Sequence, residues 1–338
     1  MGFTVLDGGF FATVQDFGRT GYQQYGITVS GAVDRRSYVL SNILVGNGEH
    51  DAGLELTFKG PTLLFDADCV IAVTGGDFDF TLNNAPLPMY KAILVRKGDI
   101  LSSGYRKTGC RAYIAFSGGI DVPPLMGSRS TYTRATLGGY HGRKLVKGDS
   151  LKLLIPGKIP PNLDKRQIPP EDFSREELTL RVILGPQNDL FTKKGIETFF
   201  SETYTVTSSF DRMGYRLDGK EIEHVKDANI VSDGISFGAI QVPGEGKPII
   251  MLSDKQTTGG YTKIGTVISS DIPVIAQCIQ GNRIRFKEVT IEEAQQAYME
   301  YYNRFHGYIA EFNKKTSEIR YSVSLNNTVY NITVEEKK

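Results

Sequence analysis

A polar segment at residues 253–258 supplies an acid, an amine, an amide and three hydroxyl groups in six consecutive positions. It follows a continuously apolar run at residues 248–252 and precedes two glycines and a tyrosine. Loops at strand ends often carry functional side chains, and glycine lets a backbone approach a ligand closely. Asp254 and Lys255 could transfer a proton or stabilise an oxyanion, whereas a turn with solvated charges is the alternative.

We predict that this loop carries the catalytic groups and that its neighbours hold the substrate. The hairpin leading into the loop has its first strand at residues 239–242 and turn residues at 243–246. Gln241 on that strand and Thr257 in the loop are predicted to bind substrate. The predicted catalytic residues are Asp254, Lys255, Gln256 and Tyr261, and the residues alone do not identify which of them is the base.

A second loop, GSRSTYTRATLGGYHGR at residues 127–143, carries three arginines and no acid before Asp149. The planar guanidinium group matches carboxylate or phosphate in bidentate fashion, so unbalanced arginines usually meet an anion. Arg129, Arg134 and Arg143 are therefore predicted to bind the substrate. A solvated loop is the alternative.

An internal repeat suggests that both loops belong to one site. FGRTGYQQYG at residues 17–26 and FDRMGYRLDG at residues 210–219 share five identities in ten positions. A glycine–glycine–tyrosine sequence also occurs at residues 138–140 and 259–261. We therefore predict corresponding positions for Arg19 and Arg212, both as substrate-binding residues, and place the two loops on opposite walls of one cleft. Arginines that only tie down turn carbonyls are the alternative.

Composition excludes several classes of function. The formal net charge is +1 and no basic stripe occurs, so neither nucleic acid nor an anionic membrane is a predicted partner. No apolar run approaches the roughly 20 residues of a membrane span, and the three scattered cysteines fit free thiols in a reducing cytosol. A cytoplasmic location is expected. The four dispersed histidines predict no metal site, and no phosphate-binding, dinucleotide-binding or serine-hydrolase motif occurs.

Short strand-like runs separated by glycine, proline, asparagine or aspartate predict a mainly β fold. The length of 338 residues exceeds what one core usually organises, which favours two domains. We place the β domains at residues 1–160 and 171–289, with the proline-rich residues 156–170 providing the linker. A closing helix is predicted at 290–312, and a tail hairpin turning at Asn326 and Asn327 at 313–338.

The chain also resembles a known family. The motifs VQDFGRTGYQQYGITVSGAVD, GSRSTYTRATLGGYHGRKLVKGD, SFDRMGYRL and GAIQVPGEGKPIIMLSDKQTTGGY are similar to those of the biotin-dependent carboxyltransferase-like family. That family includes the 5-oxoprolinase C subunit (the Kip antagonist protein), allophanate hydrolase subunit 2 and the carboxyltransferase region of urea carboxylase. The resemblance implies duplicated cyclophilin-like β-barrel domains.

The resemblance also implies a heteromeric enzyme. The leading expectation is the C subunit of an ATP-dependent 5-oxoprolinase, which opens 5-oxoproline to glutamate with an A subunit plus a Kip inhibitor-type B subunit. ATP is expected to be used by the complex, with its binding site on this chain or on a partner. The alternatives are carboxyl transfer from carboxybiotin on a partner to urea or a related amide, and a regulatory binder that antagonises a Kip-type kinase inhibitor. The tail lacks the Ala-Met-Lys-Met sequence of a biotin carrier, so this chain is not expected to carry biotin.

Overall fold

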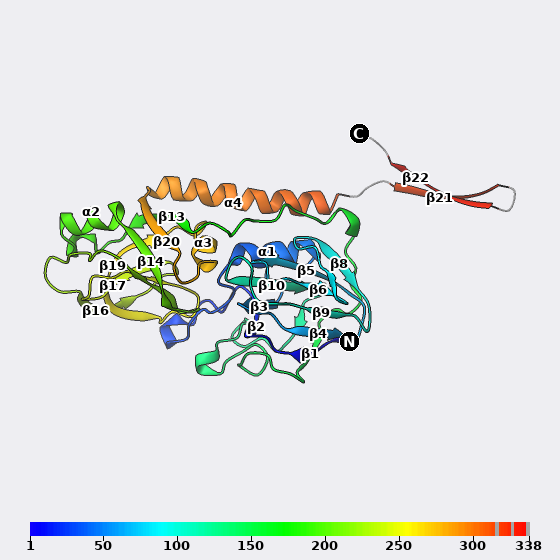
Figure 1. Cartoon of the computed structure of the whole chain (residues 1–338), viewed down its shortest axis with the longest axis horizontal. Coiled ribbons are helices and arrows are strands. Elements are labelled where there is room, and N and C mark those ends of the chain that lie inside the picture. The colour runs from blue at the N-terminus through cyan, green and yellow to red at the C-terminus, as the bar shows by residue number, and fades with distance from the viewer. Residues whose placement is uncertain (315–317, 326–327, 336–338) are drawn as a thin grey trace.

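Two β units lie side by side beneath one long helix (Figure 1). The computed structural model describes residues 1–314, 318–325 and 328–335. The N-terminal unit contains two sheets and the C-terminal unit contains one closed barrel, and the helices are few. The predicted mainly β fold class is confirmed.

The N-terminal unit packs two sheets around a common apolar core. In spatial order, the seven-stranded sheet contains β11 (Ile120–Asp121), β12 (Ser150–Leu153), β1 (Gly2–Asp7), β4 (Thr62–Phe65), β9 (Ile100–Ser102), β6 (Thr81–Leu82) and β7 (Ala85–Pro86). The five-stranded sheet contains β2 (Phe11–Gln15), β3 (Gly53–Thr57), β10 (Arg111–Phe116), β5 (Cys69–Gly75) and β8 (Ala92–Val95).

Strand β5 shows why this sheet reads as a continuous apolar run. Its residues Cys69, Ile71 and Val73 enter the core between the sheets, whereas Val70 and Ala72 face helix α1 (Arg35–Leu44). Successive side chains of a strand point to opposite faces, so a strand covered on both faces needs apolar residues at every position. Asp34 begins α1 by accepting a hydrogen bond from the Ser37 backbone N–H at 2.9 Å.

The C-terminal unit is a barrel of seven strands with an eighth strand attached. Around the barrel lie β13 (Glu177–Leu184), β20 (Arg283–Glu288), β14 (Thr203–Phe210), β15 (Gly214–Asp218), β18 (Ile249–Met251), β17 (Ala239–Val242) and β19 (Thr258–Val267). Strand β19 pairs back to β13 and closes the ring, and β16 (Asn229–Gly234) extends the sheet from β19. Only the β13–β20 pair is parallel among these strands. The helices of this unit are α2 (Lys193–Ser201) and α3 (Ile272–Ala276).

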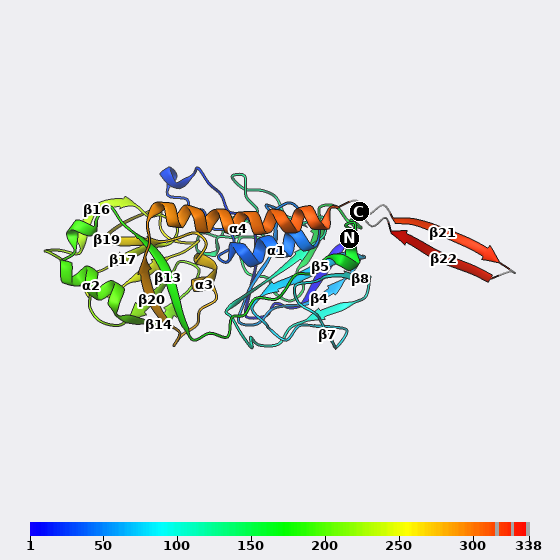
Figure 2. The same ribbon diagram turned by 90° about the horizontal axis from the view of Figure 1, so that it is seen from above.

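Helix α4 (Ile291–Phe312) ties the two units together. Ala297 packs with Ile268 of the C-terminal unit, whereas Phe305 and Phe312 join the apolar cluster around α1. Seen from above, α4 runs over both units (Figure 2). The helix therefore acts as a brace whose two ends serve different cores.

The capping box at the start of α4 gives a first stability test. The Thr290 hydroxyl accepts a hydrogen bond from the Glu293 N–H at 3.2 Å, and the Glu293 carboxylate accepts one from the Thr290 N–H at 2.8 Å. Thr290→Ala is expected to cost about 1 kcal/mol of unfolding free energy. Urea unfolding would measure the loss, and Thr290→Ser, which keeps the hydroxyl, should retain most of the stability. Equal losses in both variants would contradict a capping role.

The proline-rich segment at residues 156–170 is fastened to the N-terminal unit. Arg166 is buried, and its guanidinium donates to the backbone oxygens of Ile43 at 2.8 Å and Pro161 at 2.7 Å. Ile168 is also buried and donates its N–H to the Tyr90 carbonyl at 3.0 Å. Because Arg166 satisfies carbonyl groups at the end of α1, this linker completes the fold of the unit that it leaves.

The repeated sequence segments adopt different backbones, so the predicted equivalence of the two glycine–glycine–tyrosine sequences is wrong. Gly138 and Gly139 lie in a loop with φ of 63° and 55°, whereas Gly259 and Gly260 lie in β19. Residues 17–26 form a loop with a short 3-10 helix (Gln23–Tyr25), but residues 210–219 contain the end of β14 and all of β15. Strand pairing in the barrel imposes the extended conformation on the second copies.

The tail contains a β-hairpin, as predicted. Strand β21 (Glu318–Leu325) pairs antiparallel with β22 (Thr328–Glu335), with Leu325 opposite Thr328. The predicted turn residues Asn326 and Asn327 lie outside the described residues.

Candidate functional site

A cluster of buried charges joins the two units at their seam. The Arg212 guanidinium donates to both oxygens of Asp254, at 3.0 Å and 3.1 Å, and to the Gly31 carbonyl at 2.7 Å. Ser30 of the N-terminal unit donates its hydroxyl to Asp254 at 2.8 Å. Asp254 therefore binds its own unit and the neighbouring unit at once, and both of its oxygens are occupied.

Glu55 on β3 completes this cluster from the N-terminal unit. It is fully buried and accepts hydrogen bonds from Arg212, from the Tyr113 hydroxyl at 2.7 Å and from the Val33 N–H at 2.9 Å. Burial alone would raise the pKa of Glu55, but the charges of Arg212 and Arg111 outweigh it and hold the pKa below its usual value. Glu55 therefore stays ionised at neutral pH.

The opposite balance holds for Arg212. Burial alone would lower the pKa of its guanidinium, but Asp254 and Glu55 outweigh burial and raise the pKa. Arg212 thus carries a fixed positive charge between two carboxylates.

A second polar cluster lies around Asp16 beside the arginine loop. Asp16 accepts hydrogen bonds from the Ser128 hydroxyl and the Gly18 N–H, each at 2.7 Å. Arg19 is almost wholly buried next to it and donates to the Ser130 carbonyl. Its Nε and Nη1 atoms have no hydrogen-bond partner among the residues that the structure describes. Ser30 links the clusters, because its hydroxyl also approaches the Thr131 carbonyl at 2.9 Å.

Lys255 is the one buried lysine of the catalytic loop. Its side chain is 5% exposed, and its pKa is lowered first by burial and then by the charge of Arg35. No carboxylate within the described ranges forms an ion pair with it. The neutral amine, which is a nucleophile and a base, is thereby favoured more than in an ordinary lysine.

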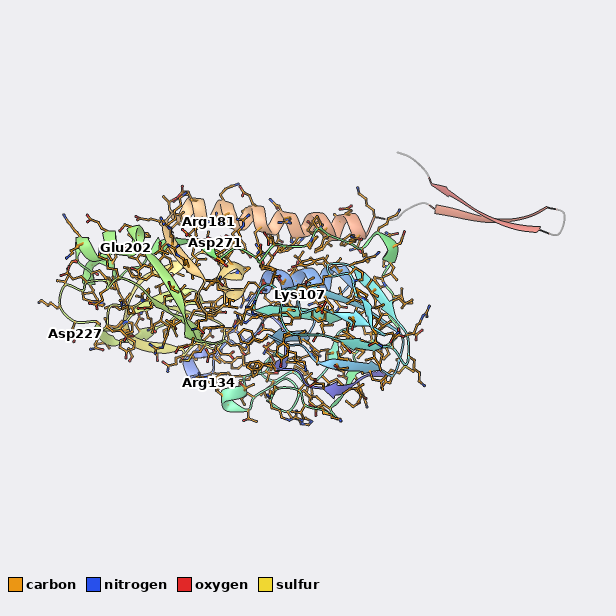
Figure 3. All side chains as sticks on the ribbon, in the orientation of Figure 1. Lys107, Arg134, Arg181, Glu202, Asp227 and Asp271 are labelled. Atoms are coloured by element: carbon orange, nitrogen blue, oxygen red, sulfur yellow. The ribbon has the colours of Figure 1, made fainter. Side chains whose placement is uncertain are left out.

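An open cleft of about 460 Å³ lies beside this seam. Its walls come from the β14–β15 turn, β17, β18 and the start of β19, and Arg134 of the N-terminal unit lies on its rim. Arg134 contacts Asp211 across the seam at 3.0 Å, and both side chains are more than half exposed. Arg134 lies at the junction of the two units in Figure 3.

Gln241 provides an unsatisfied hydrogen-bond donor in the wall of this cleft. The residue is 5% exposed, and its Nε2 has no hydrogen-bond partner within residues 1–314. A Cβ atom on Gly259 would lie 2.7 Å from this nitrogen, so glycine is needed beside it. A buried donor without a partner is costly, and a ligand carbonyl or carboxylate oxygen would satisfy it.

Four predicted site residues meet at the cleft, namely Arg134, Gln241, Gln256 and Tyr261. Four others are buried in the seam behind it, namely Arg19, Arg212, Asp254 and Lys255. The loops at residues 128–143 and 253–261 thus lie next to one another, and Arg134 is the member of the arginine loop that lines the cleft.

The structure directs the other three predicted residues elsewhere. Arg143 makes a bidentate ion pair with Asp149 at 2.7 Å and 2.8 Å, which balances its charge locally. Arg129 donates its Nε to the Val122 carbonyl at 2.9 Å. Thr257 accepts a backbone hydrogen bond from Ile235 at 3.0 Å and does not line the cleft. These side chains meet structural needs, so the arginine loop is not an anion site with three guanidinium groups.

Sequence reasoning missed the acid and the amide that join the units. Glu55 lies in an otherwise apolar strand, and that isolated acid was the available signal. Gln277 follows α3 and donates its Nε2 to Asp34 at 2.7 Å, while its Oε1 accepts the backbone N–H groups of Cys110 and Arg111 at 3.0 Å. Nothing in its local sequence marks it.

The structure contains neither a metal cluster nor a membrane helix in the part of the chain that it describes. Within those residues, no group of three or more His, Cys, Asp or Glu side chains could hold a metal ion. None of the helices there is long and apolar enough to cross a membrane.

Comparison with known proteins places the chain in a family. The family model described as carboxyltransferase domain, subdomain A and B, matches residues 25–288. The chain is 36% identical over 290 residues to the 5-oxoprolinase C subunit of Haemophilus influenzae, covering 86% of this chain and 92% of that protein. It is 34% identical over 296 residues to the 5-oxoprolinase C subunit of Escherichia coli, covering 87% and 93%.

Two solved structures are similar over nearly the whole chain. The urea carboxylase of Kluyveromyces lactis superposes with a TM-score of 0.86 at 35% identity, and the match covers 91% of this chain but 29% of that one. The urea amidolyase of K. lactis gives a TM-score of 0.85 at 35% identity, covering 91% of this chain and 20% of that one. This chain therefore spans less than a third of those enzymes. Because the family model matches most of its residues, the chain belongs to the carboxyltransferase-domain (subdomain A and B) family.

Proposed function

We propose that this chain is the C subunit of an ATP-dependent 5-oxoprolinase, which opens the lactam ring of 5-oxoproline to give glutamate together with the A and B subunits. The assignment is supported by two bacterial proteins that bear the name of this 5-oxoprolinase component and match this chain over almost their entire length. The match to the yeast enzymes covers less than a third of each. A separate subunit of this size fits the bacterial arrangement.

The buried amide of Gln241 is the observation that carries the proposal to a site. 5-Oxoproline presents a lactam carbonyl and a carboxylate, and either oxygen could accept the free hydrogen bond of Gln241 Nε2. Arg134 on the rim would attract the carboxylate, while the half-exposed Tyr261 ring offers an apolar surface to the lactam ring. The cleft would thus bind and orient the substrate.

Proton transfer by Asp254 is not part of this proposal. Arg212 and Ser30 occupy both oxygens of its carboxylate, so it has no free position for a water or a substrate proton. Lys255 remains the candidate for stabilising the oxyanion. We assign ATP use to the partner subunits, because no nucleotide-binding motif occurs in this sequence.

Reconstitution tests the proposed function directly. The full chain would be co-expressed with the A and B subunits, and ATP hydrolysis dependent on 5-oxoproline would be measured together with glutamate formation. Activity is expected only when all three chains are present. A complete complex that hydrolyses no ATP in the presence of 5-oxoproline would refute the assignment.

Carboxyl transfer to urea is the second candidate function, favoured by the family description and by the fold shared with urea carboxylase. Here the substrate would be urea, and carboxybiotin would come from a partner chain. Urea-dependent activity that avidin abolishes would support this candidate. Insensitivity to avidin, with turnover of 5-oxoproline, would support the oxoprolinase.

A purely regulatory role would require no substrate in the cleft. In that case Gln241→Leu would leave both partner binding and phenotype unchanged. In an enzyme complex, the chain with the same change is expected to bind its partners but lose turnover.

A further inference from the structure

Lys255 and Arg35 form a pair of neighbouring cations without a carboxylate partner in the described part of the chain. The acid next to Lys255 in sequence, Asp254, is already occupied by Arg212 and Ser30. Glu49 lines the same groove as Arg35 but makes no ion pair with it. Uncompensated charge in a desolvated site is unfavourable, so an anion would stabilise this pair.

The surroundings of Arg35 fix its guanidinium group in place. It lies between the rings of Phe17 and Phe237, at 5.3 Å and 5.2 Å from their centroids. Its Nη2 donates to the Phe17 carbonyl at 3.3 Å, and its buried Nε has no acceptor among the described residues. One donor of a positioned guanidinium group is therefore available to an anion.

Lys263 shows how a similarly buried lysine is normally satisfied in this fold. It is 7% exposed, and its ammonium group contacts the Asp233 carboxylate at 3.0 Å. Lys255 is 5% exposed and has no such contact within the described residues. Burial and the charge of Arg35 both lower the pKa of Lys255, which increases the fraction present as a free amine.

A neutral amine beside a cation is suited to reaction with carbon dioxide. The lone pair of Lys255 Nζ forms an N–C bond, one C–O π pair moves onto oxygen, and a proton leaves to solvent. Amine and carbon dioxide thus give a carbamate anion and a proton, with no oxidant or further reactant. Arg35 lines an open groove of about 890 Å³, through which a small apolar molecule can enter.

We propose that Lys255 is a carbamylation site, at which carbon dioxide adds to Nζ and Arg35 holds the resulting carbamate. The carbamate supplies the missing negative charge and oxygen acceptors for the free donor of Arg35. The proposal rests on these two side chains and does not depend on 5-oxoproline being the substrate.

Carbon-13 NMR of the full chain with labelled bicarbonate at about pH 8 tests this site, because bicarbonate supplies carbon dioxide at equilibrium and a carbamate carbon is resolved from both. The wild-type chain is expected to show a carbamate resonance that is lost in Lys255→Met and retained in Lys263→Met. The N-terminal amine also forms carbamates, so the resonance is assigned by its loss in the variant. Arg35→Gln is expected to weaken it several-fold.

Three results would overturn the proposal. One is a wild-type spectrum with no carbamate resonance beyond that of the N-terminus. Another is an unchanged resonance in Lys255→Met, and the third is a shifted bicarbonate signal alone, which would indicate a bound anion without a covalent bond. Lys255→Arg keeps the positive charge and serves as the second variant if the methionine variant does not fold, and it too should lose the resonance.

Discussion

Replacing Arg212 with methionine is expected to lower the free energy of unfolding by about 3 to 5 kcal/mol, because it leaves two buried carboxylates without their counter-charge. Asp254 and Glu55 both contact this guanidinium, and Glu55 is fully buried. Methionine fills most of the same space but offers no donor. The two units are joined through these contacts, so the loss should loosen the seam as well as destabilise the fold.

Urea or thermal unfolding would measure the effect, with Arg216→Met as the matched control. Arg216 lies on the adjacent β15 strand, and its pair with Glu245 at 3.6 Å is more than half exposed on both sides. Exposed pairs contribute at most about 1 kcal/mol, so the control should change stability little. Equal losses in the two variants would contradict a special role for the seam cluster.

A companion variant separates lost packing from stranded charge. In the combined variant Arg212→Met, Glu55→Gln and Asp254→Asn, no buried charge is left unpaired at this cluster. Part of the lost stability is expected to return, because neutral groups of similar shape avoid the cost of burying an uncompensated carboxylate. A combined variant less stable than Arg212→Met would show that desolvated charge is not the cause.

Gln241→Leu is expected to weaken binding of 5-oxoproline about 10- to 100-fold, since a hydrogen bond involving a charged group contributes about 1.5 to 3 kcal/mol and each 1.4 kcal/mol is tenfold. Leucine keeps a similar volume but removes the only unsatisfied side-chain donor known in the cleft wall among the described residues. Calorimetry on the assembled complex would give Kd, and steady-state assays would separate KM from kcat.

Two further variants sharpen this result. Gly259→Ala places a methyl group 2.7 Å from Gln241 Nε2 and should weaken binding by displacing the amide. Gln296→Leu removes an exposed glutamine of α4 that bonds Glu300 at 3.0 Å, so it should leave binding unchanged. If Gln241→Leu retains wild-type Kd in a complex that still turns over, the substrate binds elsewhere and the assignment to 5-oxoprolinase survives.

Local patterns correctly predicted most elements that position the cleft. The capping residues Thr290 and Glu293 marked the start of α4, and alternating or apolar runs marked the strands. The polar loop after β18 and the arginine loop were both found as neighbours of one cleft. These signals are readable because helix caps, turns and strand periodicity depend on residues close together in sequence.

The division of labour among the arginines could not be predicted in the same way. Arg143 and Arg134 look alike in sequence, yet one pairs with Asp149 six positions away and the other reaches Asp211 across the seam. The same holds for the glycine–glycine–tyrosine sequences, whose backbones differ because one copy pairs in β19. Tertiary neighbours decide such outcomes.

The sequence by itself determined a mainly β chain, a bracing helix, and the polar loop at residues 253–258 as its chemically richest segment. Only the tertiary structure decided that Asp254 is tied to Arg212, and that, among the described residues, Gln241 has a free donor and Lys255 is buried without a counter-charge. Arg212 meets Glu55 across 157 positions of sequence. Pairing and desolvation depend on which groups folding brings together, and no local pattern encodes that.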